Sequence, residues 1–334
     1  QGEGQDQHHG GDRGGAGVAG ASAARELADR GIAVRVYDKG RSPGGRAATR
    51  MRDGMHVDHG AQYFTARDPA FTAAVEELRA RGMVALWDPR LVAIDAEGGV
   101  PTGGGEQRWV AQPGMAALAT TWLAGVDLRC SQRIVGCVRD ARGWWLDLAD
   151  GRRDGPFAAL LSTLPATQAV TLLSGEPVAV GAAAIRFAPC WALMLAFERP
   201  LETGFDAAFV NTGVLSWIAR DSSKPGRPAG ERWLVHAGPA FSRAQVEATP
   251  ESVAPALLQA FFQVIGARAR EPAMMSAHRW RYALADAPLL VGALADDDRR
   301  IALGGDWCCG SRIEGAWLSG RALAERVLRS FVKC

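Results

Sequence analysis

The chain has 334 residues, of which 48% are hydrophobic and 22% charged, and its formal net charge is +2. This balance is typical of a globular protein and excludes a largely disordered or fibrous chain. The small net charge gives no electrostatic reason to expect nucleic acid as a partner. No apolar run approaches the roughly 18 residues of a membrane span, so we expect no membrane segment.

The first part of the chain alternates between helical and strand patterns. Residues 1–13 are polar, have no hydrophobic periodicity and predict a tail. Val18, Ala21, Ala24 and Leu27 then recur at helical spacing, and residues 32–37 are rich in β-branched residues and predict a strand. A second helix is predicted over residues 68–83, with Asp68 as its N-cap and a proline in its first turn.

The later elements follow from the same patterns. We expect residues 98–105 to form a flexible turn because they are rich in glycine. The remaining predictions are helices over 114–124, 251–266 and 314–331, a small antiparallel unit of strands at 126–128, 134–138 and 144–148, and further strands at 157–163, 193–197, 216–218, 233–236 and 300–305. Strand and helix alternate at both ends of the chain, so we predict an α/β domain assembled from the termini and interrupted by an insertion.

A glycine motif opens the first helix. Gly15, Gly17 and Gly20 match G-x-G-x-x-G, where glycine permits a tight turn and close backbone approach to a pyrophosphate. Asp38 follows 23 residues after Gly15, at the end of the next strand, and suits a ribose hydroxyl. Together these features predict a dinucleotide site; the alternative is a glycine-rich loop without a ligand. The strand that should precede the motif is missing, because residues 8–14 read HHGGDRG.

Two further loops favour FAD over NAD. Residues 39–46 supply glycines and cations for a second phosphate-facing loop, which the longer FAD can use. Near the other end, Gly305 and Asp306 follow a predicted strand, and Arg312–Ala316 opens the last helix. A carboxylate at a strand end beside a helix N-terminus suits the ribityl-phosphate side of a flavin.

Longer segments are more specific than these loops. They are G-A-G-V-A-G (15–20), D-K-G-R-S-P-G-G-R (38–46), D-H-G-A-Q-Y-F-T-A-R-D (58–68), R-W-V-A-Q-P-G-M (108–115), S-K-P (223–225), A-H-R-W-R-Y-A (277–283) and G-G-D-W-C-C-G-S-R-I-E-G-A-W-L-S-G (304–320). In these segments the chain resembles the bacterial renalase group of FAD-dependent oxidoreductases, which are relatives of the flavin amine oxidases.

The resemblance implies a fold like that of p-hydroxybenzoate hydroxylase, with a three-layer FAD-binding domain and a mixed β/α substrate domain. We expect residues 14–92, 126–168 and 296–331 in the first domain, and residues 93–125 and 169–295 in the second. Members of the group take hydride from the 2- and 6-dihydro isomers of NAD(P)H and pass it to oxygen, giving NAD(P)⁺ and hydrogen peroxide. The expected partners are therefore non-covalent FAD, a dihydronicotinamide dinucleotide and oxygen.

The resemblance also assigns residues. The expected flavin contacts are Gly15, Gly17, Gly20, Asp38, Lys39, Gly45, Arg46, Gln62, Tyr63, Gly305, Asp306, Arg312, Glu314, Gly315 and Ala316, with Val135 as a backbone contact on the adenine side. Hydride transfer depends on geometry and a dry pocket more than on a general base, so we expect no certain catalytic residue. The candidates for the substrate pocket are Tyr63, His236, Trp280 and Tyr282, with His278 behind them.

Other functions stay open. One alternative is a flavin amine oxidase or desaturase for another small substrate, and another is a non-catalytic nucleotide-binding protein. Lys224 is expected to be a loop charge, and Arg67 and Arg279 either meet substrate phosphates or are solvated. Cys308 and Cys309 are expected to be structural thiols, although a redox disulfide and covalent flavin attachment are both conceivable. The scattered histidines predict no metal site, and we expect a cytoplasmic monomer or weak homo-oligomer.

Overall fold

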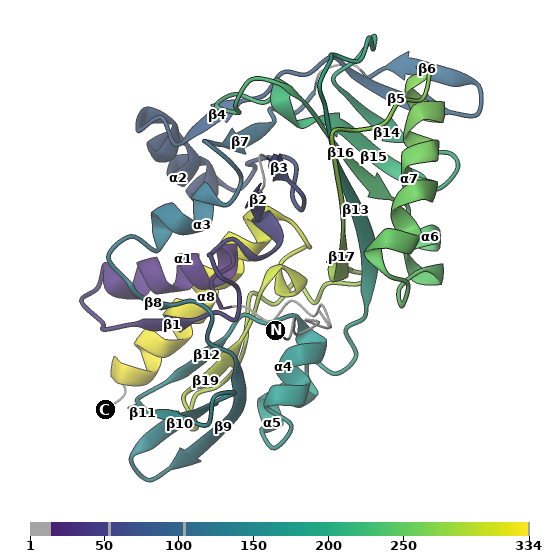
Figure 1. Cartoon of the computed structure of the whole chain (residues 1–334). Coiled ribbons are helices and arrows are strands. Elements are labelled where there is room, and N and C mark those ends of the chain that lie inside the picture. The colour runs from purple at the N-terminus through teal and green to yellow at the C-terminus, as the bar shows by residue number, and fades with distance from the viewer. Residues whose placement is uncertain (1–14, 53–54, 103–104, 333–334) are drawn as a thin grey trace, which may run out of the picture.

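The structure is a computed structural model that describes residues 15–52, 55–102 and 105–332. It consists of two domains that are packed against each other. The fold is α/β, with a Rossmann-like domain and a second domain built on a seven-stranded mixed sheet. Figure 1 shows the purple and yellow ends of the chain side by side in the Rossmann-like domain, and the green segments in the large sheet. The predicted tail, residues 1–13, lies outside the described residues.

Two helices from opposite ends of the chain form one layer of the Rossmann-like domain. They are α1 (Val18–Ala28) and α8 (Ile313–Val332). The buried face of α1 carries Ala21, Ala24 and Leu27, as the sequence periodicity predicts. Gly320 allows α8 to cross close to α1, because a Cβ there would lie 2.3 Å from the carbonyl oxygen of Ala19. These two helices, the first and the last of the described residues, therefore lie in one layer.

The strands beneath these helices form two separate sheets. In the first, β1 (Arg35–Tyr37) pairs in parallel with β8 (Asp127–Arg129). In the second, β12 (Leu160–Ser162) pairs in parallel with β19 (Ile301–Leu303), which pairs antiparallel with β18 (Leu294–Asp296). The prediction that residues 126–128 belong to an antiparallel unit was wrong, because their long-range pairing with β1 is not encoded in the local pattern.

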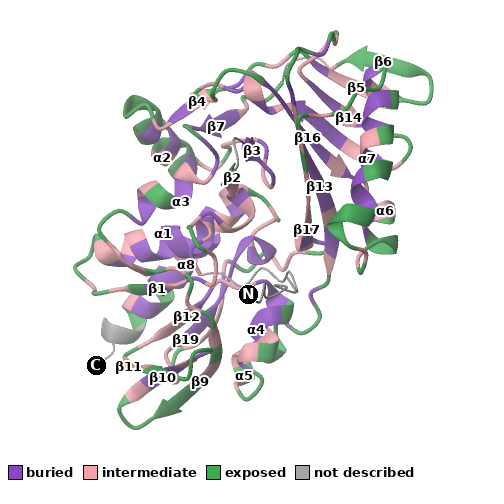
Figure 2. Ribbon diagram, viewed as in Figure 1, coloured by how far each residue is buried: buried purple, intermediate pink, exposed green. Residues whose placement is uncertain are grey.

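A third layer covers the other side of these strands. The antiparallel strands are β9 (Ile134–Asp140), β10 (Gly143–Leu148) and β11 (Arg153–Phe157), with α4 (Ala166–Leu172) and α5 (Pro177–Val180) nearby. Trp144 of β10 is fully buried in the same core cluster as Ile301 and Leu303. Figure 2 shows this interior in purple. The domain thus has the three layers that the family resemblance implies.

Smaller elements lie between the two domains. They are η1 (Gly45–Ala47), the hairpin of β2 (Thr49–Arg52) and β3 (Met55–Asp58), α2 (Pro69–Ala80), the pair β4 (Val84–Leu86) and β7 (Trp109–Ala111), and α3 (Ala117–Trp122). The Asp68 side chain caps α2 by accepting from the N–H groups of Ala70 and Phe71, as predicted.

The large sheet has seven strands. Their order is β17 (Met274–Ala285), β13 (Phe187–Phe197), β16 (Glu231–Ala237), β15 (Leu215–Arg220), β14 (Ala207–Val210), β5 (Leu91–Asp95) and β6 (Gly98–Pro101). The prediction of a flexible turn over residues 98–105 was wrong for Gly98–Pro101, which pairs with β5 as an edge strand. Asp95 closes the hairpin by accepting from the N–H groups of Glu97 and Gly98, and this turn brings the glycines into register.

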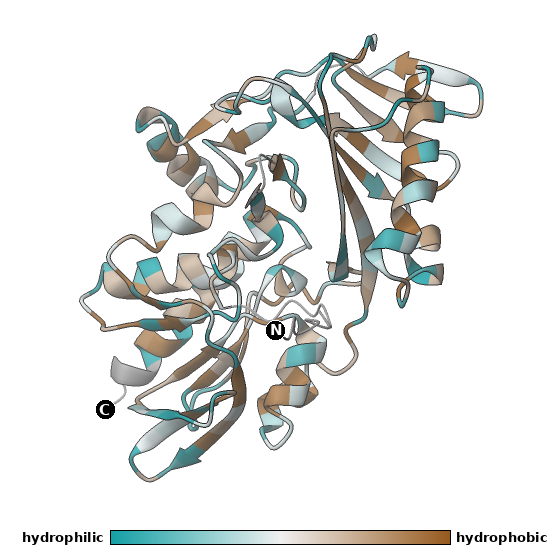
Figure 3. Cartoon of the chain, viewed as in Figure 1, coloured by the Kyte–Doolittle hydropathy of each residue, from teal (hydrophilic) through white to brown (hydrophobic). Residues whose placement is uncertain are grey.

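Helices cover one face of the large sheet. They are α6 (Pro239–Ala244) and α7 (Pro250–Ile265), and α7 buries Val253, Leu257 and Phe261 against the sheet. Figure 3 shows apolar and polar residues interspersed along α7. The opposite face of the sheet is turned toward the Rossmann-like domain. Among the described residues, no helix combines the length and hydrophobicity needed to cross a bilayer.

Candidate functional site

A cavity of about 590 Å³, here called the interdomain cavity, lies between the Rossmann-like domain and the large sheet. The Rossmann-like domain contributes the N-terminus of α1, the η1 turn, the loop 60–65 and the residues around the start of α8. The sheet contributes Phe209, Trp217, His236 and Trp280. A concave site between two domains, with backbone on one side and aromatic rings on the other, is a common form of ligand site.

The N-terminus of α1 forms the backbone side of this cavity. Gly17 is the N-cap, no side chain caps the first turn, and Val18, Ala19 and Gly20 line the cavity. The first N–H groups of a helix have no partner within it, and the helix dipole makes this end favourable for an anion. Gly45 approaches closely: its φ is +54°, and a Cβ there would lie 3.1 Å from the Gly17 Cα. Side chains at these glycines would narrow the cradle.

Asp38 joins the two glycine loops. Its carboxylate accepts from the N–H of Ala16 at 2.8 Å and from the N–H of Gly40 at 2.7 Å, and the residue is 5% exposed. Burial raises the pKa of Asp38, while the two backbone hydrogen bonds oppose that rise. The carboxylate therefore holds the glycine motif and the 39–46 loop against each other.

Arg46 and Asp306 form a bidentate ion pair at the cavity wall. Arg46 Nη1 donates to Asp306 Oδ2 at 2.8 Å, and Arg46 Nη2 donates to Asp306 Oδ1. Arg46 also donates to the carbonyl of Ala283 at 2.9 Å. Gly305, with φ +145°, precedes the short turn η3 (Asp306–Cys308). Through these hydrogen bonds, the Arg46 side chain joins η1 to Asp306 of η3 and to Ala283 of β17.

Most of the predicted residues meet at the interdomain cavity. The lining residues among them are Gly17, Gly20, Gly45, Arg46, Gln62, Tyr63, His236, Trp280, Gly305, Asp306, Arg312, Glu314 and Ala316. Arg67, which the sequence left as either a phosphate contact or a solvated charge, also lines this cavity and pairs with Glu106. Segments that are far apart in the sequence therefore meet at the interdomain cavity, as we expected from the sequence motifs.

Some predicted residues lie elsewhere. Gly15 and Lys39 line a second cavity, beside β1. Val135 is 49% exposed on β9 and lines neither of the two cavities described here. Tyr282 packs edge-on against Phe187, with ring centroids 5.8 Å apart, instead of lining the interdomain cavity. Tyr282 was predicted to line the substrate pocket together with Trp280, but of the two only Trp280 lines the interdomain cavity.

Gly315 and Glu314 act at the start of α8. A Cβ on Gly315 would lie 2.4 Å from the carbonyl oxygen of Cys309, so glycine is required for this turn to close. The Glu314 carboxylate accepts from the backbone N–H groups of Arg67 and Asp68 at 2.6 and 2.8 Å. These contacts join the start of α8 to the chain that leads into α2.

Aromatic rings form the wall of the cavity on the side of the sheet. The ring centroids of Tyr63 and Trp217 lie 5.8 Å apart, and those of Phe209 and Trp217 lie 4.8 Å apart. Trp280 donates its indole N–H to the carbonyl of His59 at 2.7 Å. The indole nitrogen of Trp217 is buried and has no hydrogen-bond partner among the described residues. Trp217 lines the cavity but was not among the predicted site residues. Its indole N–H is a hydrogen-bond donor that no described residue uses.

Three histidines lie at this wall: His236 lines the cavity and is half-buried, His278 is half-buried, and His59 is buried. Burial lowers the pKa of His236 and of His278 to about 4, and it lowers that of His59 well below its usual value. His59 stacks on Trp280 with ring centroids 5.0 Å apart, and His278 meets Trp280 edge-on at 4.4 Å. At neutral pH these rings are uncharged, so they form a neutral wall around Trp280.

A buried ion cluster was missed in the sequence. Lys224, expected to be a loop charge, has a fully buried side chain, and its Nζ donates to Asp221 at 2.6 Å and to Asp58 at 3.1 Å. Arg227 donates to the same Asp58 at 2.6 Å. Lys224 Nζ also donates to Gln62 Oε1 at 3.2 Å, behind the cavity lining. Asp58 and Lys224 both lie in segments that carry the family resemblance, which was the available signal.

The two aspartates in this cluster differ in their pKa shifts. For Asp58, burial alone would raise the pKa, but the charges of Lys224 and Arg227 outweigh burial and the pKa is lowered to about 2. Burial raises the pKa of Asp221. Charges that are fully removed from water persist only when they are paired and hydrogen-bonded. The ion pairs of Lys224 with Asp58 and Asp221 therefore hold the end of β3 against the turn η2 (Asp221–Ser223).

None of the cysteines that the structure describes forms a disulfide. Cys130, Cys137, Cys190, Cys308 and Cys309 are free thiols. Burial raises the pKa of Cys308 to about 12 and raises that of Cys309. Since the thiolate is the reactive form, these shifts oppose reactivity at neutral pH.

The chain is similar to known flavoproteins. Residues 14–78 match the NAD(P)-binding Rossmann-like domain, and residues 100–328 match the family described as flavin containing amine oxidoreductase. Over 63 residues the chain is 46% identical to hydroxyneurosporene desaturase of Rubrivivax gelatinosus; this stretch is 18% of the chain and 12% of the desaturase.

Solved structures resemble almost the whole chain. Cyclohexylamine oxidase from Brevibacterium oxydans IH-35A has a TM-score of 0.74 at 13% identity, over 96% of this chain and 100% of that one. A putrescine oxidase with bound putrescine has a TM-score of 0.71 at 13% identity, over 94% and 97%. A protein from Exiguobacterium sp. 255-15 assigned as a protoporphyrinogen oxidase has a TM-score of 0.75 at 14% identity, over 93% and 96%. At these identities the likeness shows the fold alone.

Proposed function

The chain belongs to the family of flavin-containing amine oxidoreductases, and from this membership we propose that it is an FAD-dependent oxidase for a small substrate with a flat ring. FAD is the cofactor expected of this family. The expected site is the interdomain cavity, with the cofactor between the Rossmann-like domain and the aromatic wall of the large sheet.

The residues of the cavity fit FAD. The uncapped first turn of α1 and Arg46 would hold the pyrophosphate, the loops joined by Asp38 would hold the adenosine side, and the start of α8 would hold the ribityl side. The close approach of Gly17 and Gly45 leaves a cradle that any Cβ would narrow. When bound, FAD supplies a hydride acceptor that passes the electron pair to oxygen.

For the substrate we propose the 2- and 6-dihydro isomers of NAD(P)H. The single observation that carries this choice is the presence of arginine side chains in the lining of the interdomain cavity. Arg46, Arg67 and Arg312 line it together with three carboxylates, which all have partners: Glu106 pairs with Arg67, Asp306 pairs with Arg46, and Glu314 accepts two backbone N–H groups. The formal charges of the lining therefore balance, and the guanidinium groups of Arg67 and Arg312 suit the phosphate groups of a dinucleotide substrate.

The reaction is balanced without a further reagent. A dihydronicotinamide, oxygen and one proton give NAD(P)⁺ and hydrogen peroxide. The side chains of this chain orient the ring and exclude water, because hydride transfer depends on alignment more than on proton transfer by the protein. The aromatic side chains of Tyr63, Trp217 and Trp280 line the cavity, and the neutral His236 adds no charge to that wall.

An amine substrate is the second candidate. The family membership and the fold shared with cyclohexylamine oxidase and putrescine oxidase favour it. The aromatic pair Tyr63 and Trp217 would pack against an alkyl or cyclic amine. Oxidation of an amine with oxygen and water would give an aldehyde or ketone, ammonia and hydrogen peroxide.

Anaerobic mixing distinguishes the two candidates. The FAD-loaded protein is mixed with 2-dihydroNAD(P), with 6-dihydroNAD(P), and separately with cyclohexylamine and putrescine, and the flavin absorbance near the visible maximum is followed. We expect the dihydronicotinamides to bleach the flavin, and air to restore the colour with peroxide release. Bleaching by amines alone would favour the second candidate, and bleaching by neither class would contradict both.

A further inference from the structure

A contact with the main chain orients the imidazole of His236 in the wall of the interdomain cavity. His236 lies on β16 and lines the cavity, and its Nε2 is 3.4 Å from the backbone carbonyl oxygen of His59. Trp280 donates its indole N–H to the same oxygen at 2.7 Å. Ring nitrogens from two strands of the large sheet therefore meet at one carbonyl group.

This contact decides which nitrogen of His236 carries the hydrogen. A carbonyl oxygen only accepts, so Nε2 donates, and the neutral ring then has its free lone pair on Nδ1. Burial lowers the pKa of His236 to about 4, so the ring is neutral at pH 7. Among the residues that the structure describes, no donor is bonded to Nδ1. His236 therefore offers a hydrogen-bond acceptor in the cavity wall.

A β-bulge brings a donor to the same face of the sheet. Leu215 of β15 pairs with Ala237 and Trp217 pairs with His236, so Ser216 is an extra residue in this ladder. Leu215 packs on the face of the sheet that α7 covers, and strict alternation along β15 would direct Trp217 to that face as well. Because of the bulge, Trp217 instead lines the interdomain cavity, opposite His236 on the neighbouring strand.

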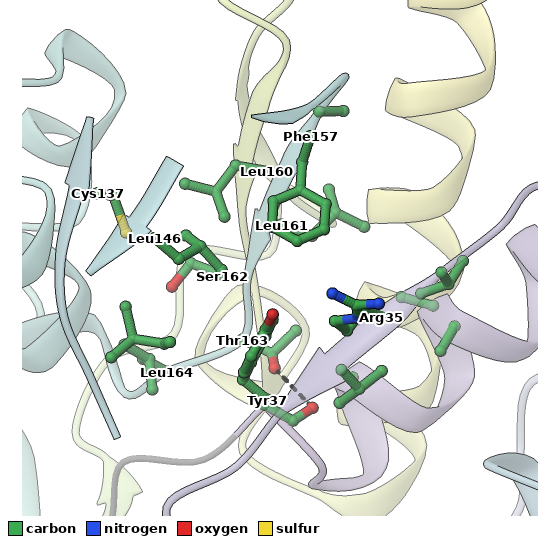
Figure 4. A pocket seen from close by; sticks show the side chains of 18 of the residues that line it. Arg35, Tyr37, Cys137, Leu146, Phe157, Leu160, Leu161, Ser162, Thr163 and Leu164 are labelled. Atoms are coloured by element: carbon green, nitrogen blue, oxygen red, sulfur yellow. Dashed lines mark hydrogen bonds between the residues drawn. The ribbon is translucent and has the colours of Figure 1, made fainter. Parts of the chain in front are cut away.

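The polar groups of Trp217 and His236 differ from those of two residues in the second cavity, beside β1. Figure 4 shows Arg35 and Tyr37 at that cavity, and both donate hydrogen bonds to the carboxylate of Asp154. The buried indole N–H of Trp217, by contrast, has no partner among the described residues. The interdomain cavity thus offers a ligand a donor and an acceptor on two neighbouring strands.

A primary carboxamide on a flat ring matches this pair of groups. Its oxygen accepts and its NH₂ group donates, so one substituent can use both side chains. A protonated amine has donors but no acceptor, and it would have to leave water for a wall whose histidine is neutral. The rings of Tyr63 and Trp280 line the same cavity and suit a flat partner. The wall therefore favours a ring with a carboxamide over an amine.

We propose that His236 and Trp217 bind the carboxamide of the substrate, whose NH₂ group donates to His236 Nδ1 and whose oxygen accepts from the Trp217 indole N–H. That the ring bearing this carboxamide is a dihydronicotinamide rests on the proposed function. His236 is then the residue that determines specificity, because it contacts the amide nitrogen. That nitrogen is what distinguishes a carboxamide from a methyl ketone of the same shape.

Binding of two probes of the same shape to the FAD-loaded protein tests this assignment without any turnover. Benzamide carries the amide N–H groups, and acetophenone has a methyl group in their place but keeps the ring and the carbonyl. We expect calorimetric titration to give a Kd for benzamide about threefold to tenfold lower than for acetophenone, the range of one neutral hydrogen bond. Equal binding of the two probes, tighter binding of acetophenone, or binding of neither would overturn the proposal.

Two variants locate the preference for benzamide. His236→Phe keeps a ring in the wall but removes the acceptor, so it should abolish the preference. Trp217→Phe removes the donor to the oxygen that both probes share, so it should weaken both by the same factor, about threefold to tenfold, and keep the preference. The control is Trp122→Phe, on α3 and outside the cavity lining, which should bind both probes as the parent does. A preference that survives His236→Phe, or that Trp217→Phe abolishes, would overturn the assignment.

The result is independent of the flavin-bleaching experiment. Bleaching by the dihydronicotinamides without a preference for benzamide would leave the proposed function standing and overturn the carboxamide site. A preference for benzamide that depends on His236, without such bleaching, would support the carboxamide site and contradict the proposed substrate.

Discussion

The ammonium group of Lys224 lies 3.1 Å from the carboxylate of Asp58, and 166 residues separate them in the chain. Both side chains are fully buried. Asp58 ends β3 beside the Rossmann-like domain, and Lys224 follows η2 in the domain of the large sheet, so this pair joins the two walls of the interdomain cavity. Gln62 accepts from the same ammonium, which places the lining of the cavity in the same network.

Removing this charge should destabilise the protein strongly. Lys224→Met leaves the carboxylates of Asp221 and Asp58 buried with the charge of Arg227 beside them, and breaking a buried pair from one side costs about 3–5 kcal/mol. Urea unfolding should show that loss in the free energy of unfolding. The control is Glu76→Gln, which removes an exposed pair with Arg79 and should cost less than about 1 kcal/mol. A loss below about 1 kcal/mol for Lys224→Met would contradict a structural role of the cluster.

Asp38 should be required for tight binding of FAD. Asp38→Ala removes the acceptor for the N–H groups of Ala16 and Gly40, and each hydrogen bond to a charged group contributes about 1.5–3 kcal/mol. We expect the Kd for FAD, measured by quenching of flavin fluorescence, to rise at least about tenfold. Asp29→Ala changes an exposed carboxylate at the other end of α1 and should leave the Kd unchanged. Unchanged affinity in Asp38→Ala would refute its role in holding the loops.

Stability should fall as the pH falls from neutral toward 4. The unfolded chain protonates its histidines near their ordinary pKa of about 6.5, whereas His236 and His278 in the folded chain protonate only near a pKa of about 4. Between these values the unfolded state binds more protons, so each histidine lowers the free energy of unfolding by up to about 1.4 kcal/mol per pH unit of acidification.

Urea unfolding at pH 7, 6 and 5 measures this slope. His278→Phe keeps an aromatic ring beside Trp280 and should remove one histidine's share of the pH dependence. A free energy of unfolding that stays constant from pH 7 to pH 5 would show that these rings are not held neutral by burial.

Local patterns in the sequence were sufficient for the elements that depend on local physics. The helical period of Val18, Ala21, Ala24 and Leu27 predicts α1, and Asp68 with the following proline predicts the start of α2. The glycine spacing and Asp38 predict a turn that leads into α1, and in the structure the N–H of Ala16 in that turn donates to Asp38. Each of these depends on contacts within about four residues or on one strand and its neighbouring helix.

Long-range pairing was beyond the reach of the same patterns. The parallel partner of β8 and the edge position of β6 depend on strands far away in the chain. The burial of Lys224 depends on Asp58 and Asp221 together, and a single lysine in a loop gives no local signal of that. Trp217 was not predicted as a site residue. What singles it out is that its buried indole nitrogen has no hydrogen-bond partner among the described residues, and the sequence cannot show this.

Trp217 should contribute to substrate binding through that nitrogen. Trp217→Phe keeps an aromatic ring at the cavity wall but removes the buried N–H, which has no partner among the described residues. A neutral hydrogen bond contributes about 0.5–1.5 kcal/mol, so we expect KM to rise about threefold to tenfold while kcat changes little, the pattern of an interaction made equally in the ground and transition states.

Steady-state kinetics under air, with the substrate that bleaches the flavin, would measure both constants for Trp217→Phe. Trp122→Phe is the matched control, because Trp122 is also buried but lies on α3 and does not line the interdomain cavity. The control should leave KM unchanged, and the absorbance spectrum of bound FAD should be the same in both variants. An unchanged KM in Trp217→Phe would mean that the indole N–H does not meet the substrate, and a lower kcat alone would place Trp217 in alignment of the ring instead of in binding.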